Sequence, residues 1–387
     1  MSVAMFGQKD YDRSGGVEVV VTELSTRLAS MGCRVTCYNR SAGIKRKKSH
    51  KYKGVTERYV PTLAGKGAAA VTSSFFAALA CAFGSYDVVH IHAEGPAAMC
   101  WIPKLLGKKV MVTVHGLDWK RQKWTDGRGL GSKYIFWGER CLAKWADQII
   151  VLSRDVKKYF KETYERETVL IPNGVSRPVR KNADRIKKAY GLTEPEESPY
   201  ILYLARLVPE KRADLLIEAF QKMTADGRFP DVSLIIAGDS SSTDDYVARL
   251  KHLAAGNDRI IFPGFVQGDI LDELYSNACV YVLPSDLEGM PIGLLEAMSY
   301  GNCCLISDIP ECADVAENKA VRFRQGDAED LRLKLEDLLN HPEKVKKYRA
   351  QTADFILQKY DWDEVAEQTL KLYQTGAKAC HIAVSSK

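Results

Sequence analysis

The chain of 387 residues is too long for one hydrophobic core of ordinary size, so we expect two domains of roughly 150 to 200 residues each. Its 46% hydrophobic and 27% charged residues are typical of a soluble globular protein. No signal peptide begins at Met1, and the longest apolar run, 71–83, is shorter than the roughly 20 residues that a membrane span needs. We therefore expect a cytosolic protein.

The net charge of +6 is unevenly distributed. Residues 1–172 carry 28 basic and 15 acidic side chains, whereas the remainder carries 27 and 34. The densest basic run is 45–48, which is either a solvated loop or a site of attraction to an anionic membrane or a pyrophosphate-bearing lipid. No motif that reads bases accompanies the charge, so we do not expect a nucleic-acid partner. The ten cysteines lack regular spacing, which favours reduced thiols.

The first half alternates strand and helix patterns, which predicts a parallel sheet. A strand at 3–6 precedes a loop and a helix that continues to Leu28. Gly15 and Gly16 at the start of this helix permit a close backbone approach to a ligand or form a plain turn. The loop lacks the glycine spacing of dinucleotide-binding folds, which argues against a nicotinamide enzyme. A helix at 73–83, rich in alanine and phenylalanine, is expected in the core.

Histidines follow two buried strands. His90 and His92 share one face of the strand at 87–92. A third metal ligand with suitable spacing is missing, so hydrogen-bonded histidines are favoured over a metal site. His115 follows the strand at 110–114, where open sheets place ligand groups. It either binds a sugar hydroxyl or phosphoryl oxygen or packs as a structural histidine. A turn at 171–175 ends the first domain.

The second half opens with a strand at 200–205, and Arg206 and Lys211 lie on either side of the turn that follows. They form either an anion site or a surface pair. A strand at 232–239 contains Gly238 near its end, and another lies at 259–266.

The strand at 278–283 leads into a loop and then a helix with Pro291 in its first turn. Backbone N–H groups of 289–293 and the helix dipole predict an anion site. Glu288 and Glu296 lie beside it, and carboxylates there suit a ligand that carries hydroxyls as well as phosphates, such as a nucleotide sugar. The alternative is that Glu288 caps the helix and Glu296 is solvated.

Residues 285–311 resemble the E-x7-E region of family-4 retaining glycosyltransferases of the GT-B fold. The resemblance implies an α/β protein with two Rossmann-like parallel-sheet domains facing a central cleft. Residues 1–172 would form the acceptor-binding domain, with a helix at 361–375 packing back onto it. Residues 173–360 would form the donor-binding domain. The reaction would need neither metal nor cofactor.

The resemblance also implies roles for individual residues. Arg206 and Lys211 would neutralise the diphosphate leaving group, Glu296 would bind the ribose, and Glu288 would bind the transferred sugar. His115 would be a further catalytic residue. The remaining implied contacts are donor-binding at Gly15, Gly16, Gly238, Val266, Gly289, Met290, Pro291 and Ile292, and acceptor-binding at Asp118 and Trp119.

Residues 115–124 resemble a bacterial subgroup that includes rhamnosyltransferases of cell-wall and capsular polysaccharide synthesis. This implies transfer of rhamnose from dTDP-rhamnose to a lipid-pyrophosphate-linked saccharide, by a protein peripheral to the inner face of the membrane. UDP-hexose or UDP-N-acetylhexosamine donors, and a non-catalytic nucleotide-sugar-binding role, are the alternatives. Same-face attack is favoured over a covalent intermediate on Glu288. Asp361 and Asp363 spell a metal-binding D-x-D, but their position at a helix start favours a cap.

Overall fold

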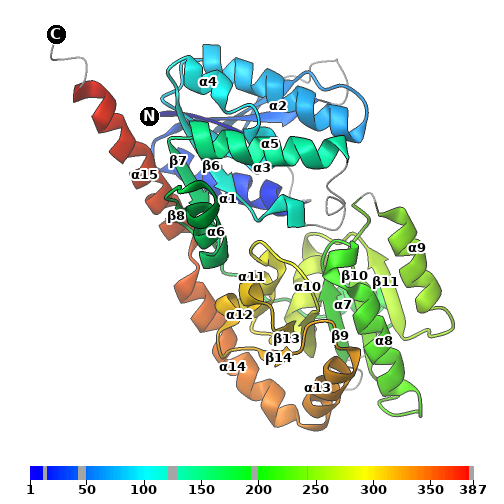
Figure 1. Cartoon of the computed structure of the whole chain (residues 1–387). Helices are drawn as coiled ribbons and strands as arrows, with labels where there is room; N and C mark the ends of the chain where they lie inside the picture. The colour runs from blue at the N-terminus through cyan, green and yellow to red at the C-terminus, as the bar shows by residue number, and fades with distance from the viewer. Residues whose placement is uncertain (12–14, 42–48, 121–128, 193–198, 242, 383–387) are drawn as a thin grey trace. The chain divides into compact units, whose positions relative to one another are not determined.

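The computed structural model describes residues 1–11, 15–41, 49–120, 129–192, 199–241 and 243–382. The basic run at 45–48 lies outside them. The chain divides into two compact units (Figure 1). Unit 1 comprises Met1–Gly174 and Trp362–Lys387, and unit 2 comprises Val175–Asp361. Within the described ranges, no helix has the length and apolar character needed to cross a bilayer.

Unit 1 contains a sheet in the order β3-β4-β2-β1-β5-β6-β7-β8. Its strands are β1 (Ser2–Phe6), β2 (Arg34–Arg40), β3 (His50–Tyr52), β4 (Val55–Val60), β5 (Val88–His92), β6 (Lys109–Val114), β7 (Gln148–Val151) and β8 (Val169–Leu170). The pairings are parallel except for the β3–β4 hairpin. The strands after β1 are laid first on one side of it and then, from β5, on the other, which is the doubly wound order of Rossmann-like domains.

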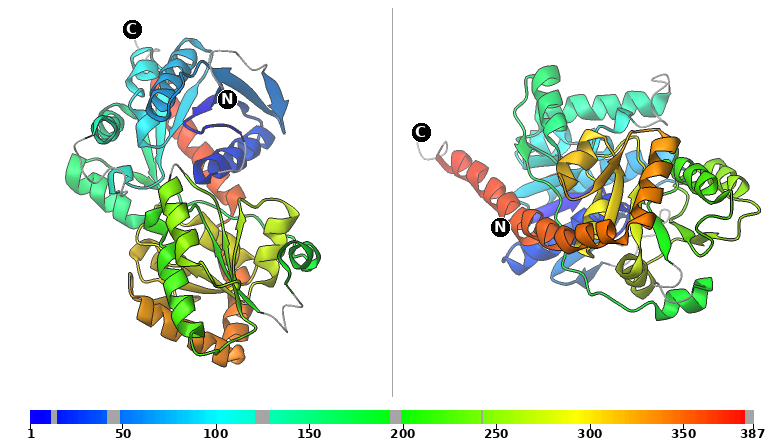
Figure 2. Two further views of the ribbon diagram at one scale, coloured as in Figure 1. Left: turned by 90° about the vertical axis from the view of Figure 1, so that its right-hand side faces the viewer. Right: turned by 90° about the horizontal axis from the view of Figure 1, so that it is seen from below.

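The helices of unit 1 cover both faces of this sheet (Figure 2). They are α1 (Gly16–Ser30), α2 (Lys66–Phe83), α3 (Glu94–Ala97), α4 (Trp101–Leu105), α5 (Leu130–Trp145), α6 (Arg154–Tyr164) and α15 (Trp362–Ile382), with a 3-10 turn η1 (Asp118–Lys120). Apolar side chains of α2, α5 and α6 build the core on one face. Those of α1 and α15 build the core on the other face.

Helix α15 is joined to unit 1 by polar contacts as well as apolar ones. The buried Tyr373 hydroxyl lies 2.6 Å from Nδ1 of His90, whose Nε2 lies 2.7 Å from the Thr113 hydroxyl. Arg27 of α1 donates to Asp363 at 2.6 Å. Because both ring nitrogens of His90 have partners, the interpretation of His90 as a hydrogen-bonded structural histidine is confirmed.

Unit 2 contains a parallel sheet in the order β11-β10-β9-β12-β13-β14. Its strands are β9 (Tyr200–Leu204), β10 (Ser233–Ala237), β11 (Ile260–Gly264), β12 (Val280–Leu283), β13 (Cys303–Ser307) and β14 (Val321–Phe323). Its helices are α7 (Asp184–Tyr190), α8 (Ala213–Thr224), α9 (Asp244–Leu253), α10 (Asp269–Asn277), α11 (Ile292–Ser299), α12 (Pro310–Ala316), α13 (Ala328–Asn340) and α14 (Pro342–Lys359), with a 3-10 turn η3 (Pro209–Lys211). The predicted fold class, with two Rossmann-like parallel sheets, is confirmed.

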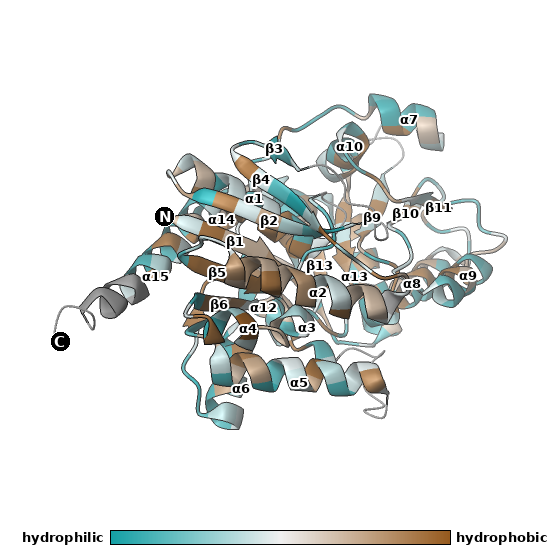
Figure 3. Cartoon of the chain, turned by 90° about the horizontal axis from the view of Figure 1, so that it is seen from above, coloured by the Kyte–Doolittle hydropathy of each residue, from teal (hydrophilic) through white to brown (hydrophobic). Residues whose placement is uncertain are grey.

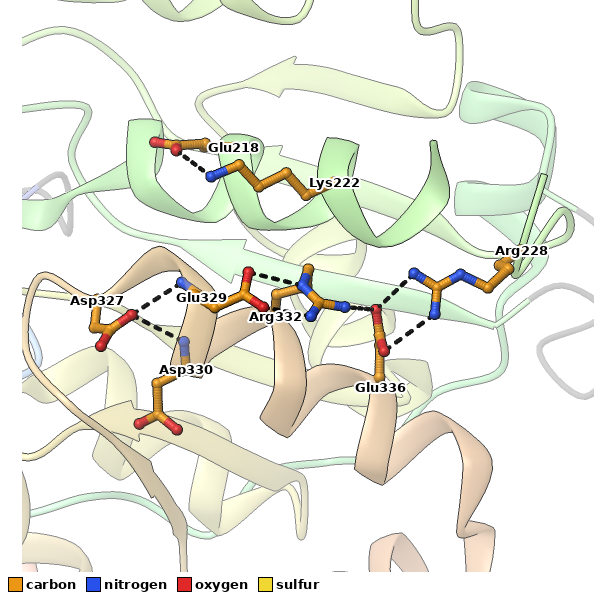
Figure 4. Close-up of polar contacts among 8 residues, drawn as sticks. All are labelled: Glu218, Lys222, Arg228, Asp327, Glu329, Asp330, Arg332 and Glu336. Carbon is orange, nitrogen blue, oxygen red and sulfur yellow. Dashed lines mark hydrogen bonds and ion pairs between the residues drawn. The ribbon is translucent and has the colours of Figure 1, made fainter. Parts of the chain in front are cut away.

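Helix α13 shows how local chemistry fixes an element at the edge of unit 2. The Asp327 carboxylate accepts from the backbone N–H of Glu329 at 3.0 Å and so caps the helix (Figure 4). Farther along, Arg332 lies between Glu329 and Glu336, and Arg228 donates to both oxygens of Glu336 at 3.1 and 3.2 Å. A cap contributes about 1 kcal/mol, whereas exposed ion pairs contribute less.

Helix α2 departs from the prediction in two ways. It begins at Lys66 rather than residue 73, because the alanines before Ser73 are the best helix formers and extend the helix backwards. Its phenylalanines were expected in the core, yet Phe75, Phe76 and Phe83 are exposed. The small residues of α2 face the sheet instead, and the phenylalanines are left on the outer side.

We predict that Tyr373→Phe lowers the free energy of unfolding by about 1 to 3 kcal/mol, because the ring still fills its place while Nδ1 of His90 loses its partner. Urea unfolding measures the loss. Tyr52→Phe, at a tyrosine with 41% of its surface exposed, is the control and is expected to change little. Equal effects of the two substitutions would contradict this account of how α15 is held.

Candidate functional site

The strand order of unit 2 reverses between β9 and β12, and ligands of open parallel sheets bind at the carboxyl ends of strands at such a reversal. Arg206 follows β9, and Glu288 follows β12. Lys211 ends η3 in the loop after β9, and Glu296 lies on α11 in the connection after β12. The fold therefore brings all four predicted polar residues of unit 2 to the same edge.

Lys211 and Glu288 form a buried ion pair between Nζ and Oε1. Their side chains are only 13% and 6% exposed, so the alternative of a surface pair does not hold for Lys211. The Ser285 hydroxyl also donates to Oε1 of Glu288, at 2.7 Å. Glu288 does not cap α11, since Pro291 is the residue at the cap position and α11 has no side-chain cap.

Two further contacts fasten the loop after β9 to the loop after β12. The backbone N–H of Asp286 donates to the carbonyl of Glu210 at 2.9 Å. Arg212 donates to the Asp286 carboxylate at 3.0 Å and has a left-handed backbone with φ of 51°. Sequence reasoning assigned no role to Asp286 or Arg212. Their position in the chain could have indicated such a role, because Asp286 lies two residues before Glu288 and Arg212 directly follows Lys211.

Buried tyrosines support the second carboxylate. Tyr275 donates to Oε2 of Glu296 at 3.1 Å, and Tyr281 donates to the carbonyl of Leu204 at 3.4 Å. Burial raises the pKa of Tyr281 well above its usual range, and the charges of Glu288 and Glu296 add to the effect. Both carboxylates thus act on one phenol. Glu296 is partly buried and bonded to Tyr275, so the alternative of a solvated charge is wrong.

A third tyrosine connects Arg206 with the same edge. The Tyr203 hydroxyl donates to the backbone carbonyl of Arg206 at 3.3 Å. Burial raises the pKa of Tyr203 well above its usual range, the charge of Glu288 contributes to the rise, and the guanidinium of Arg206 opposes it. The opposite charges of Arg206 and Glu288 therefore both act on the Tyr203 phenol.

Helix α11 starts at Ile292, so Pro291 lies at the cap position rather than within the first turn as predicted. The carbonyl of Pro291 accepts from the N–H groups of Leu294 and Leu295. The backbone N–H groups of Ile292 and Gly293 come before the first of these hydrogen bonds in the chain. N–H groups at such a helix start are suited to bind an anion. A Cβ on Gly293 would lie 2.9 Å from the Tyr281 hydroxyl oxygen, so only glycine lets α11 pack this closely. Gly289 and Met290 lie in the loop just before Pro291.

The other predicted donor contacts of unit 2 lie at the neighbouring strand ends. Gly238 follows β10 with φ of 143°, and a Cβ there would be 1.9 Å from the carbonyl oxygen of Ala205. Its N–H donates to the carbonyl of Gly264 at 2.9 Å. Val266 follows β11 by two residues.

In unit 1, Gly15 and Gly16 lie at the start of α1, with Gly15 at the cap position. A Cβ on Gly15 would be 2.3 Å from Oε2 of Glu18. The other oxygen of Glu18 accepts from the backbone N–H of Lys9 at 2.9 Å. Glu18 therefore folds back over the start of its own helix, beside Gly15.

His115 follows β6, and its Nε2 lies 3.2 Å from Nδ1 of His92. Burial lowers the pKa of His90 to about 3 and that of His92 well below its usual value, so both are neutral at physiological pH. Among the described residues, no group of three or more His, Cys, Asp or Glu side chains has the arrangement of a metal site.

Asp118 and Trp119 lie in η1, close after His115. The backbone N–H of Asp118 donates to Oε2 of Glu94 at 2.9 Å. The Trp119 ring lies 5.9 Å from the rings of both Phe136 and Tyr159. Sequence reasoning missed Glu94, which follows His92 closely and carried no motif of its own.

Comparison with known proteins identifies related sequences for both units. Residues 14–177 match the family described as Glycosyltransferase Family 4, and residues 184–355 match the family described as Glycosyl transferases group 1. A UDP-Gal:alpha-D-GlcNAc-diphosphoundecaprenol alpha-1,3-galactosyltransferase of Escherichia coli is 30% identical over 234 residues, which are 58% of each chain. The alpha-D-kanosaminyltransferase of Streptomyces kanamyceticus is 24% identical over 308 residues, which are 74% of this chain and 76% of that one.

Among solved structures, sucrose-phosphate synthase from Thermosynechococcus elongatus has a TM-score of 0.83 at 18% identity, and the match covers 98% of this chain and 99% of that one. This likeness supports the GT-B fold. The sequence matches to the Escherichia coli and Streptomyces proteins span 58% and 76% of those chains.

We predict that Lys211→Met lowers the free energy of unfolding by about 3 to 5 kcal/mol, because it leaves the buried Glu288 carboxylate without its cation. The double variant Lys211→Met with Glu288→Gln should recover most of the loss, since a neutral amide retains the bond to Ser285. Urea unfolding of the three proteins tests this. A double variant as unstable as Lys211→Met would show that the pair is not what holds the two loops.

Proposed function

Because the chain belongs to the family 4, group 1 glycosyltransferases, whose donors are nucleotide sugars, we propose that it transfers a hexosyl residue to a lipid-diphosphate-linked saccharide during the assembly of a bacterial surface polysaccharide. The nucleotide-sugar donor is supported by one observation above all. Lys211, Glu288, Glu296 and the start of α11 lie at the same edge of the unit 2 sheet, where its strand order reverses. The acceptor half is supported by the name of the Escherichia coli relative, which acts on a diphosphoundecaprenol-linked sugar.

In this proposal each charge of unit 2 contacts a different part of the donor. Lys211 has three donor hydrogens, so it can bind a phosphoryl oxygen while it remains paired with Glu288. Arg206 and the amides at the start of α11 supply further positive potential where the diphosphate leaves. Glu296, held by Tyr275, binds the ribose hydroxyls, and Glu288 binds hydroxyls of the transferred sugar.

We propose that the anomeric configuration is retained through attack on the same face, with the departing phosphate accepting the acceptor's proton. Protein cations and the helix start then stabilise the leaving diphosphate without a divalent metal. The contacts of Glu288 favour this same-face attack over a covalent intermediate on Glu288. Its Oε1 already accepts from Ser285 and pairs with Lys211, so that oxygen is a poor nucleophile. His115, Asp118 and Trp119 of unit 1 are proposed to contact the acceptor and the transferred group.

Two classes of donor remain for the proposal. The relatives' names favour a UDP-linked hexose, since one uses UDP-galactose. The resemblance of residues 115–124 favours dTDP-rhamnose, although no relative named above is a rhamnosyltransferase. Residues 121–124 lie outside the described residues. The Escherichia coli relative is named for a UDP-galactose donor, so the UDP-hexose is our first candidate and dTDP-rhamnose the second.

We propose that the outer side of α2 rests on the membrane that carries the acceptor. Phe75, Phe76 and Phe83 are 38%, 39% and 79% exposed, although phenylalanine is usually buried. The helix has no acidic residue in its first turn and is drawn largely brown in Figure 3. Residues 1–172 carry an excess of basic side chains that would favour anionic lipid. An interfacial helix of this kind lies on a bilayer rather than crossing it.

We predict that a donor panel with a lipid-diphosphate-linked acceptor gives one sugar transferred, detected by mass spectrometry, and that EDTA leaves the rate unchanged. Glu296→Gln should raise the donor KM about tenfold or more, because it weakens a charged hydrogen bond to the ribose. Lys211→Ala should lower kcat by about 100-fold to 1,000-fold.

Lys222→Ala is the matched control, because Lys222 is an exposed lysine of the same unit paired only one helical turn away with Glu218. Circular dichroism at the assay temperature verifies that each variant is folded. Full activity of Lys211→Ala, or binding of nucleotide sugar without any transfer, would contradict the proposed function. Loss of activity in EDTA that Mn²⁺ restores would contradict the metal-free scheme.

We predict that the double variant Phe75→Ser with Phe76→Ser loses most of its sedimentation with liposomes that contain anionic lipid, because two exposed rings no longer enter the interface. Leu333→Ser removes a comparably exposed apolar side chain of unit 2 and should sediment like the wild type. Wild-type protein that fails to sediment with anionic liposomes would refute the membrane contact.

A further inference from the structure

Two fully buried carboxyl groups lie behind the segment 115–119 of unit 1. Glu94 begins α3 directly after β5, at the strand reversal of the unit 1 sheet. Glu139 lies on α5, and both residues are 0% exposed. Helices α3 and α5 approach so closely that a Cβ on Gly138 would lie 2.2 Å from the carbonyl oxygen of Glu94. The two carboxyls are within hydrogen-bonding reach of each other.

The partners of the four carboxyl oxygens leave one gap. Oε2 of Glu94 accepts from the backbone N–H of Asp118 at 2.9 Å. Oε1 of Glu139 accepts from the hydroxyls of Tyr159 and Tyr164 on α6, at 2.6 and 2.5 Å. Oε1 of Glu94 and Oε2 of Glu139 are buried and have no donor among the described residues. A buried acceptor without a donor costs about 1 to 3 kcal/mol.

One proton fills this gap. If one carboxyl is protonated, its O–H donates to the other, and every oxygen has a partner. The pair then carries a single negative charge, which faces three donors from Asp118, Tyr159 and Tyr164. Two ionised carboxylates in contact would instead repel each other, and the strongest charges that act on Glu94, those of Asp118 and Glu139, are both negative.

We propose that Glu94 and Glu139 hold one proton between them, and that this pair positions the segment 115–119 for the transfer reaction. The positioning role rests on the proposed function, because the segment 115–119 carries His115, Asp118 and Trp119. Glu94 and Glu139 are positioning residues, since they act through the backbone of Asp118 and contact neither substrate.

Electrostatics at the pair agree with this geometry. Burial raises the pKa of Glu94 well above its usual value, and the charges of Asp118 and Glu139 add to the rise. Burial and the bonds to Glu139 likewise raise the pKa of Tyr159 and Tyr164, so both phenols remain donors. The titratable groups that act most strongly on Glu94 are Asp118 and Glu139, while Tyr159 and Tyr164 face Glu139.

The sign of the pH dependence follows from the raised pKa of Glu94. Its contribution to stability is fully present below the ordinary value of 4.5 and is lost as pH rises through the raised folded value. In Glu94→Gln, an amide N–H replaces the shared proton and does not titrate. The denaturation midpoint of the wild type should therefore fall, relative to that of Glu94→Gln, as pH rises from about 4.5.

A double-substitution cycle on the full chain tests the shared proton by urea unfolding. Glu94→Gln and Glu139→Gln should each be tolerated, because one amide donates to the remaining carboxylate. The double variant puts two amide NH₂ groups face to face, or turns them away from their present donors. Its loss of midpoint should exceed the sum of the two single losses. Additive losses, or no change with pH between wild type and Glu94→Gln, would overturn the shared proton.

Kinetics tests the positioning role. Glu94→Ala removes the acceptor of the Asp118 N–H, so the acceptor KM should rise by on the order of tenfold to a hundredfold, and the donor KM, which depends mainly on unit 2, should rise much less. Glu94→Gln should restore the acceptor KM, because its amide oxygen accepts the same bond. Equal changes in both KM values, or no rescue by glutamine, would overturn positioning. If no transfer occurs with any donor, the proposed function has failed, whereas the unfolding cycle still decides the shared proton.

Discussion

The buried ion pair of Lys211 and Glu288 is the contact on which the candidate donor site depends. It joins the loop after β9 to the loop after β12, the two strands between which the unit 2 sheet reverses. Taking both charges out of water is costly, and the bond from Ser285 offsets part of that cost. A buried pair of this kind fixes loop geometry more than it adds stability, and loop geometry is what a diphosphate site requires.

The rest of the donor site follows from that fastening. When the two loops are fixed, the first turn of α11 packs through Gly293 against the Tyr281 hydroxyl. The positive end of the helix dipole and the first backbone amides then lie at the same edge as Lys211. Glu296 then meets Tyr275 one helical turn farther on. The cations Arg206 and Lys211 lie in the loop after β9, whereas the carboxylates Glu288 and Glu296 lie in the loop and the helix after β12. The proposed function assigns the cations to the phosphates of the donor and the carboxylates to its hydroxyl groups.

In unit 1, the buried polar groups in and just after β5 are neutral or share a proton instead of forming full ion pairs. His90 and His92 are held neutral by burial, and Glu94 with Glu139 forms a pair that needs only one negative charge. Helix α15 contributes to this arrangement, since the Tyr373 hydroxyl supplies a partner for His90.

The strand and helix alternation, the two Rossmann-like sheets and the placement of Arg206, Lys211, Glu288 and Glu296 at one edge were all predictable from sequence, because they rest on local patterns or on family motifs. The partners of those residues were not. Tyr275 reaches Glu296, and Glu139 meets Glu94, through tertiary packing that no spacing in the chain reveals. The burial of the α2 side chains was also mispredicted. The small residues of α2 pack against the sheet, and its phenylalanines are exposed.

The most direct test of the central claim is a crystal structure with the nucleoside diphosphate of the accepted donor bound. We expect the distal phosphate within hydrogen-bonding distance of Nζ of Lys211 and of the first amides of α11, with the ribose hydroxyls on Glu296. A nucleotide bound elsewhere, with the Lys211–Glu288 pair making no contact to it, would contradict the account.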